Sequence, residues 1–206
     1  MSASEVGARW DQKYTSKPRG FGEQPNAFLE QVADRIAPNS LVIVPGDGYG
    51  RNGLWLARRG NHVLIVELSE VGLKLARKTA EQENLNLDVV QADLAEWTPP
   101  ACDAYVSIFV HLQPEARRHM HHAAAKALRP GGLIIMEAFN PDQRKNERTS
   151  GGPRSPELLY TPEMLREDFA ELEIELLTTE TVELHEGDYH SGTADVVRLL
   201  AARRER

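Results

Sequence analysis

The sequence predicts an α/β fold, a three-layer sandwich in which helices cover both faces of a seven-stranded, mostly parallel sheet. Two observations predict it. Short apolar runs alternate with helix-like segments over roughly the first two thirds of the chain, which is typical of βαβ units. Two strand-like stretches then follow one another near the end, around a glycine-containing turn. They indicate an antiparallel C-terminal strand pair that closes one edge of the sheet.

The elements are expected in a fixed order. Five strands are predicted at 41–44, 62–68, 87–94, 103–112 and 133–139, and the range 103–112 includes the exit of the fourth strand. The helices between them are predicted at 51–60, 69–84 and 114–128. Three residues support these bounds. Gly60 is typical of the end of the first helix, Ser69 can cap the start of the second, and Pro130 stops the third.

The last quarter of the chain follows a different pattern. A short helix is predicted at 161–169, with Thr161 as N-cap and Pro162 at its first position. The antiparallel strand pair is predicted at 171–184 and 194–203. The segment 140–160 begins with a loop rich in Pro, Gly, Ser and Arg, and we interpret it as an insertion after the fifth strand.

Composition limits the classes of function. The 206 residues, 41% hydrophobic and 27% charged, predict a single domain over 1–206. The segment 1–28 contains no predicted strand, and we expect it to form an N-terminal arm over the site. A formal net charge of -7 argues against nucleic acid and anionic membranes as partners. The lone Cys102 excludes an internal disulfide and a cysteine zinc site. Without a targeting or membrane-spanning segment, a cytoplasmic location is expected, and the oligomeric state is left open.

Candidate chemistry concentrates in VPGDGYGRN (44–52), which follows the first strand and opens the first helix. Ligands of open α/β sheets bind beyond the carboxyl ends of the strands, and glycines let the backbone approach them closely. The glycines are Gly46, Gly48 and Gly50. A dinucleotide-binding loop has the spacing G-x-G-x-x-G, which would need a glycine at Arg51. The spacing therefore weakens a nicotinamide interpretation.

Two acids end the next two strands. Glu67 lies 19 residues after Gly48, where a carboxylate can accept hydrogen bonds from both ribose hydroxyls of an adenosine ligand. Asp93 ends the third strand, where it can accept from an adenine amino group. Either acid alone is more often a solvated strand end. Their order after a glycine loop favours an adenosine-containing ligand.

These residues resemble the class I S-adenosylmethionine-dependent methyltransferases, which have a Rossmann-like sheet. VPGDGYGRN, IVELS (65–69), QADL (91–94) and LRPGG (128–132) carry the resemblance, over about residues 5–203. The segment WDQKY…GFGEQPNAFL (10–29) is similar to the tellurite-resistance and thiopurine methyltransferase branch. The resemblance implies S-adenosylmethionine as cofactor and a small-molecule acceptor, for instance a thiol or a chalcogen anion.

The resemblance also implies which residues bind the cofactor. Gly46, Gly48, Gly50 and Glu67 would hold its amino-acid and ribose parts, and Asp93 and Leu94 its adenine. Ser107 and Phe109 would border the methionine part. Trp10 and Tyr14, four residues apart, would place aromatic rings over the sulfonium or simply anchor the arm. The predicted set is completed by Asp47, Arg51 and Leu68.

His111, just past the fourth strand, is the one candidate for a catalytic base, and a loop histidine with a structural hydrogen bond is the plainer interpretation. No metal site is predicted, although His185 and His190 bracket a turn with two acids. Basic side chains in the loop after the fifth strand would favour an anionic substrate, unless that loop is only solvated.

Two other functions stay open. One is a nucleotide-dependent oxidoreductase on a Rossmann sheet. The other is a non-catalytic protein that binds the cofactor, because many relatives carry an acid in place of Val44 and a cysteine in place of Asp47.

Overall fold

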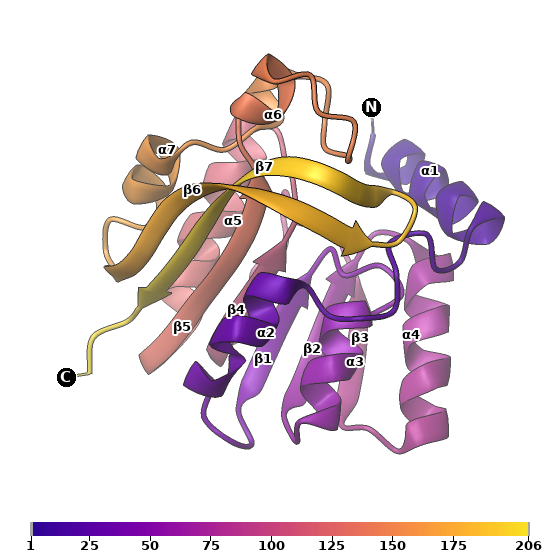
Figure 1. Cartoon of the computed structure of the whole chain (residues 1–206). Helices are drawn as coiled ribbons and strands as arrows, with labels where there is room; N and C mark the ends of the chain where they lie inside the picture. Colours follow the sequence, from indigo (N-terminus) through magenta and orange to yellow (C-terminus); the bar gives the residue numbers. More distant parts are fainter. Residues whose placement is uncertain (1, 206) are drawn as a thin grey trace.

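The computed structural model describes residues 2–205 and confirms the predicted sheet. Its seven strands lie in the order β3-β2-β1-β4-β5-β7-β6 (Figure 1). β1–β5 are parallel and β7 runs antiparallel to both of its neighbours. The strands span Leu41–Pro45 (β1), His62–Glu67 (β2), Leu87–Gln91 (β3), Cys102–Ile108 (β4), Leu128–Phe139 (β5), Glu173–Glu186 (β6) and His190–Ala202 (β7).

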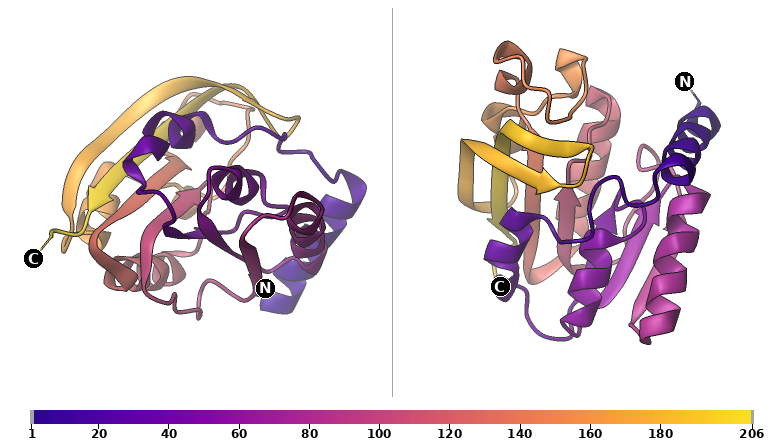
Figure 2. Two further views of the ribbon diagram at one scale, coloured as in Figure 1. Left: turned by 90° about the horizontal axis from the view of Figure 1, so that it is seen from below. Right: turned by 45° about the vertical axis from the view of Figure 1, so that its right-hand side comes forward.

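Helices cover both faces of the sheet (Figure 2). One apolar core packs α2, α3 and α4 against the sheet, and the other packs α5 and α7 against its opposite face. The helices are α1 (Ala3–Ser16), α2 (Ala27–Val32), α3 (Arg51–Arg58), α4 (Glu70–Glu83), α5 (Pro114–Ala127), α6 (Asp142–Lys145) and α7 (Pro162–Asp168), with the 3-10 turns η1 (Ala33–Arg35) and η2 (Pro156–Leu158).

The predicted helix starts are confirmed at two caps. The Ser69 side chain accepts a hydrogen bond from the Gly72 N–H at the start of α4. The Thr161 side chain accepts from the Met164 N–H at the start of α7, which has Pro162 in its first turn. Each cap satisfies one N–H that the first helical turn leaves without a partner.

Some predicted bounds are wrong in ways that matter for the site. β4 ends at Ile108, within the predicted range 103–112 that included the exit of the strand, and Phe109 after it takes a left-handed conformation with φ of 54°. β6 and β7 together reach closer to their turn than predicted, so only residues 187–189 separate them. The segment 140–160 contains α6 and η2 rather than being a bare loop.

The N-terminal arm and the β6–β7 turn meet beyond the carboxyl ends of the strands. The hairpin crosses the molecule toward the chain that follows α1 (Figure 1). There the Tyr189 N–H donates to the Gly20 carbonyl oxygen over 3.0 Å. Gly187, with φ of 72°, lies against the backbone of Gly20 and Gly22, where a Cβ would collide. This contact places the hairpin and α1 on the same side of the sheet as the glycine loop.

Among residues 2–205, no helix is long and apolar enough to cross a membrane.

Candidate active site

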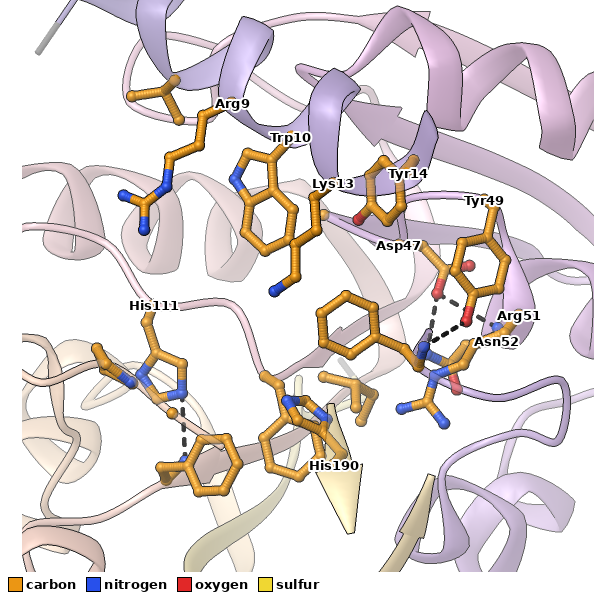
Figure 3. A pocket seen from close by; sticks show the side chains of 18 of the residues that line it. Arg9, Trp10, Lys13, Tyr14, Asp47, Tyr49, Arg51, Asn52, His111 and His190 are labelled. Atoms are coloured by element: carbon orange, nitrogen blue, oxygen red, sulfur yellow. Dashed lines mark hydrogen bonds between the residues drawn. The ribbon is translucent and has the colours of Figure 1, made fainter. Parts of the chain in front are cut away.

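A cavity of about 670 Å³ lies beyond the carboxyl ends of the strands, under α1 (Figure 3). This volume is within the range of small-molecule sites, which is roughly 300–1,000 Å³. The side chains come from α1, the glycine loop, the ends of β4 and β5, and β7. The predicted site residues in its wall are Trp10, Tyr14, Gly46, Asp47, Arg51, Phe109 and His111.

The glycine loop owes its shape to backbone that other residues rarely adopt. Gly46 and Gly48 have φ of 60° and 57°. The Gly46 N–H donates to the Val66 carbonyl oxygen over 2.7 Å, which ties the loop to β2. A Cβ on Gly48 would collide with the Tyr14 hydroxyl, so α1 can pack directly on the loop only because this residue is glycine.

Asp47 caps α3 from within the loop. Its Oδ1 accepts from the side-chain amide of Asn52, and its Oδ2 accepts from the Gly53 N–H over 2.7 Å. Burial raises the pKa of Asp47 to about 6, against the lowering effects of the Gly53 N–H and the Arg51 charge. Asp47 thus takes part in the local structure of the loop as well as in the cavity wall.

The raised pKa of Asp47 predicts a stability that depends on pH. The ordinary pKa of an aspartate carboxyl is 3.8, and the pKa of Asp47 in the folded protein is about 6. As the pH rises between these two values, the unfolded chain loses its proton before the folded protein does, and the folded state loses stability. The free energy of unfolding of the wild type, relative to Asp47→Asn, should therefore fall by up to about 3 kcal/mol between pH 4 and pH 6 and then level off. Urea denaturation of both proteins at several pH values measures this, and a constant difference would contradict it.

Glu67 ends β2 with its carboxylate turned inward, 6% exposed. Its Oε2 accepts from the Gly48 N–H over 3.1 Å, and its Oε1 accepts from the N–H groups of Leu68 and Ser69 over 2.8 and 2.9 Å. Burial raises the pKa of Glu67, while these three bonds oppose the shift. A carboxylate has about four acceptor positions, so one remains for a ligand hydroxyl rather than the predicted two.

Like Glu67, six other predicted site residues lie outside the cavity wall, namely Gly48, Gly50, Leu68, Asp93, Leu94 and Ser107. Asp93 accepts from the Ala95 N–H through Oδ1, which leaves its Oδ2 for a ligand. Leu94 and Ser107 are buried in the fold, and Leu68 contributes its N–H to Glu67. Gly50 has φ of 88° before α3 and packs near Ile65. Gly48 lies beneath Tyr14. In this conformation α1 therefore covers the Glu67 end of β2.

α1 is held over the loop by polar contacts. Asp11 accepts hydrogen bonds from the Ser69 hydroxyl and from the Val71 N–H, the latter over 3.0 Å. Trp10 and Tyr14 share a face of the helix as predicted, with their rings stacked at 5.7 Å. Phe21 adds a third ring, 6.2 Å from Trp10 and 6.5 Å from Tyr14. The helix and the chain after it thus present a group of aromatic rings to the cavity, a surface that suits a cation, and the Lys13 ammonium lies over two of these rings, Trp10 and Phe21.

His111 lines the cavity, but both of its ring nitrogens have backbone partners. Nδ1 lies 2.6 Å from the Leu158 carbonyl oxygen, to which it donates, and Nε2 accepts from the Phe139 N–H over 3.3 Å. Burial lowers the pKa of His111 to about 4. The imidazole is therefore neutral, and its basic nitrogen is already in a hydrogen bond. This arrangement suits a residue that joins three segments better than one that accepts a proton.

The opposite end of the cavity is aromatic and is formed by Phe109, His111, Phe139 and His190; we call it the acceptor end. Phe109 stacks on Phe139 with ring centroids 4.5 Å apart, and its own φ of 54° is a strained conformation of the kind that gathers at functional sites. His190 packs edge-on against both rings, at 4.7 and 5.4 Å.

A buried polar network lies behind the acceptor end. Arg51 donates to Glu186 Oε2 over 2.6 Å, and Asn26 donates to Glu186 Oε1 over 2.8 Å. His190 Nδ1 is 3.6 Å from Glu186 Oε2 and has no hydrogen-bond partner within the described chain. Burial lowers the pKa of His190, as do the charges of Arg51 and Lys13, against the raising effect of Glu186. His190 is therefore neutral at pH 7.

The remaining polar candidates were weighed as a metal site at His185 and His190 and as a basic cover from the loop after β5. His185 is exposed whereas His190 is buried, and no group of three or more metal-ligating side chains occurs within residues 2–205. In the loop after β5, Arg144 donates to four carbonyl groups of its own segment, and Arg148 pairs with Asp195 over 2.8 Å. These two arginines stabilise the loop rather than cover the cavity with positive charge.

Two cationic residues of the cavity wall were not predicted, namely Arg9 and Lys13. Both lie on α1, and Lys13 is three residues from Trp10, which puts the two side chains on one face of the helix. That spacing is the signal that could have identified Lys13, once Trp10 was placed over the cavity.

Comparisons with known proteins identify the family. A methyltransferase domain model matches residues 42–132, from β1 into β5. A thiopurine S-methyltransferase of Aliivibrio fischeri is 27% identical over 157 residues, which cover 66% of this chain and 73% of that protein. The chain is a class I S-adenosylmethionine-dependent methyltransferase. The methyltransferase resembles the tellurite-resistance and thiopurine branch, and this result displaces the oxidoreductase and non-catalytic alternatives.

Solved structures share the fold of this methyltransferase. TehB from Haemophilus influenzae superposes with a TM-score of 0.73 at 21% identity, over 95% of this chain and 67% of that one. The magnesium protoporphyrin IX methyltransferase ChlM from Synechocystis PCC 6803, with bound SAH, gives a TM-score of 0.70 at 17% identity, over 98% and 99% of the two chains.

The residues present fit S-adenosylmethionine. The loop leaves no Cβ at Gly46 and Gly48, Glu67 keeps one acceptor position at the end of β2, and aromatic rings from α1 suit the sulfonium. A ligand that used Glu67 would need α1 to move away from it, because Tyr14 and the Asp11 contacts cover that end.

Proposed function

We propose that this methyltransferase transfers a methyl group to a small, soft nucleophile that reacts as an anion, either a thiolate or a chalcogen anion. The observation that carries the proposal is His111, whose ring nitrogens are both bonded to the backbone. The predicted base is therefore engaged, and a nucleophile that is already ionised needs none. The sulfur acceptor named for the Aliivibrio fischeri relative supports this choice.

The cofactor supplies an electrophilic methyl group on a cationic sulfonium. We propose that Gly46, Asp47 and the loop around them hold its amino-acid part, while Glu67 and Asp93 hold the ribose and the adenine. Trp10 and Tyr14 would cover the sulfonium. The protein then acts by aligning the acceptor and excluding water. The acceptor's electron pair would form the bond to the methyl carbon, the pair of the broken carbon–sulfur bond would stay on the leaving sulfur, and no proton would move in that step.

A second candidate function has its own observation. His190 is neutral, buried and bordered by Glu186, so it has the surroundings of a general base. A base at this place would permit a hydroxyl or amine acceptor, at a rate about 10²–10⁴-fold above the reaction without it.

An acceptor screen tests the proposal. The purified chain is given cofactor labelled in the methyl group, with thiols, selenite, tellurite, phenols and amines as acceptors. Label should pass to thiols or chalcogen anions, and at least tenfold more slowly to phenols and amines of similar size. A phenol or an amine as the best acceptor would favour the His190 alternative and overturn the proposal.

His111→Ala should cost less than about tenfold in kcat with the best thiol or chalcogen acceptor. The reason is that the imidazole supports Leu158 and Phe139 rather than taking a proton. Steady-state kinetics measure the loss, and calorimetry checks that cofactor affinity is normal. A thousandfold loss with normal cofactor binding would identify His111 as a general base.

A further inference from the structure

Lys13 places a cation without an anionic partner in the cavity. Figure 3 shows its side chain extending from α1 into the open space, on the side away from Asp47. Its Nζ lies 4.8, 4.5 and 4.3 Å from the ring centroids of Trp10, Phe21 and Tyr189. Among residues 2–205 no carboxylate forms an ion pair with it. Three aromatic rings thus hold the ammonium in place without neutralising it.

The other charges of the cavity do not compensate Lys13. Asp47 is occupied at the start of α3, and Glu186 is paired with Arg51. Arg9, one turn before Lys13 on α1, adds a second positive charge to the cavity wall. Burial lowers the pKa of Lys13, and the charge of Arg9 lowers it further. A bound anion would remove both penalties.

Lys13 also lies on the side of the cavity where the acceptor is expected. Its ammonium contacts the ring of Tyr189 in the β6–β7 turn and the ring of Phe21. Phe21 in turn packs on His190 at the acceptor end, with ring centroids 4.8 Å apart.

We propose that Lys13 binds the anionic nucleophile of the acceptor and lowers the pKa of an acceptor thiol, so that the thiol releases its proton to water and the thiolate forms at neutral pH. This inference rests on the proposed function. A thiol beside an ammonium ion ionises more readily, because the positive charge stabilises the thiolate. The same charge repels a cationic sulfonium. Lys13 is therefore expected to favour the acceptor and not the cofactor, a combination that a purely structural residue would not produce.

The test compares Lys13→Met with Lys17→Met. Lys17 is close by on the same segment but pairs with Asp188 and is not in the cavity wall, so its loss controls for the general charge of the arm. Thiophenol is the acceptor, and kcat and kcat/KM are measured across pH in the full chain. Lys13→Met should lose at least tenfold in kcat/KM at pH 7, and the acid limb of its kcat, which reports the bound thiol, should move up by about one pH unit. Lys13→Arg should recover most of the loss.

Cofactor affinity, measured by calorimetry, separates the outcomes. It should be unchanged or tighter in Lys13→Met. Unchanged kinetics in Lys13→Met, or an equal loss in Lys17→Met, would overturn the inference while leaving the proposed function intact. If the wild type methylates no thiol or chalcogen anion at all, the proposed function itself fails, whatever the variants do.

Discussion

Replacing Arg51 by methionine should lower the free energy of unfolding by about 3–5 kcal/mol, the usual cost of breaking a buried ion pair by removing one partner. The side chains of Arg51 and Glu186 are only 7% and 8% exposed, and their contact joins α3 to the end of β6. Without Arg51, the Glu186 carboxylate would remain buried with Asn26 as its hydrogen-bond donor and His190 nearby. Urea denaturation of wild type and variant measures the loss.

Two further variants make this prediction specific. The double variant Arg51→Met with Glu186→Gln removes the uncompensated charge and should recover part of the loss. Arg58→Met is the matched control on the same helix, because the ion pair of Arg58 with Glu83 is exposed. The two side chains are 43% and 39% exposed, respectively. Its cost should stay below about 1 kcal/mol. Equal losses for Arg51 and Arg58 would show that burial of the pair has no energetic consequence.

Removing the Glu67 carboxylate should have a large effect on the cofactor. Glu67→Ala should weaken S-adenosylmethionine binding at least tenfold, because a charge-assisted hydrogen bond contributes about 1.5–3 kcal/mol. The side chain also satisfies the N–H groups of Gly48, Leu68 and Ser69, so the alanine variant should lose stability as well.

Glu67→Gln separates the two effects, since the amide keeps the shape and one acceptor oxygen. It should retain more stability than Glu67→Ala and still bind the cofactor more weakly than the wild type. Glu70→Ala, three residues further on at the exposed start of α4, is the control and should leave affinity unchanged. Calorimetry that finds normal cofactor affinity in folded Glu67 variants would remove this residue from the site.

The sheet could be predicted because its strands are short apolar runs, and their type does not depend on distant contacts. The glycine loop and Glu67 could be placed for the same reason, since each follows a strand directly. The number of ligand bonds that Glu67 can make could not be predicted. It depends on which backbone N–H groups turn toward the carboxylate, and that follows from the loop geometry.

The surroundings of the histidines and of Lys13 depend on long-range packing. The partner of His111 Nδ1 is a carbonyl 47 residues away, in a segment that the sequence predicted only as an insertion. Lys13 would be a solvated helix residue if α1 were not docked on the glycine loop. One of the three aromatic rings around its ammonium is that of Tyr189, from the other end of the chain. Periodicity within α1 shows that Lys13 shares a face with Trp10, but it carries no information on contacts with distant segments of the chain.

The most direct test asks whether the acceptor reacts as an anion without an enzyme base. It measures the pH dependence of kcat/KM of the wild-type chain for two thiols of different pKa. If the acceptor reacts in this way, the acid limb moves with the thiol, and the two limbs differ by nearly the difference between the two thiol pKa values. An identical limb for both thiols would report one ionising group of the enzyme, and His190 would then be the base.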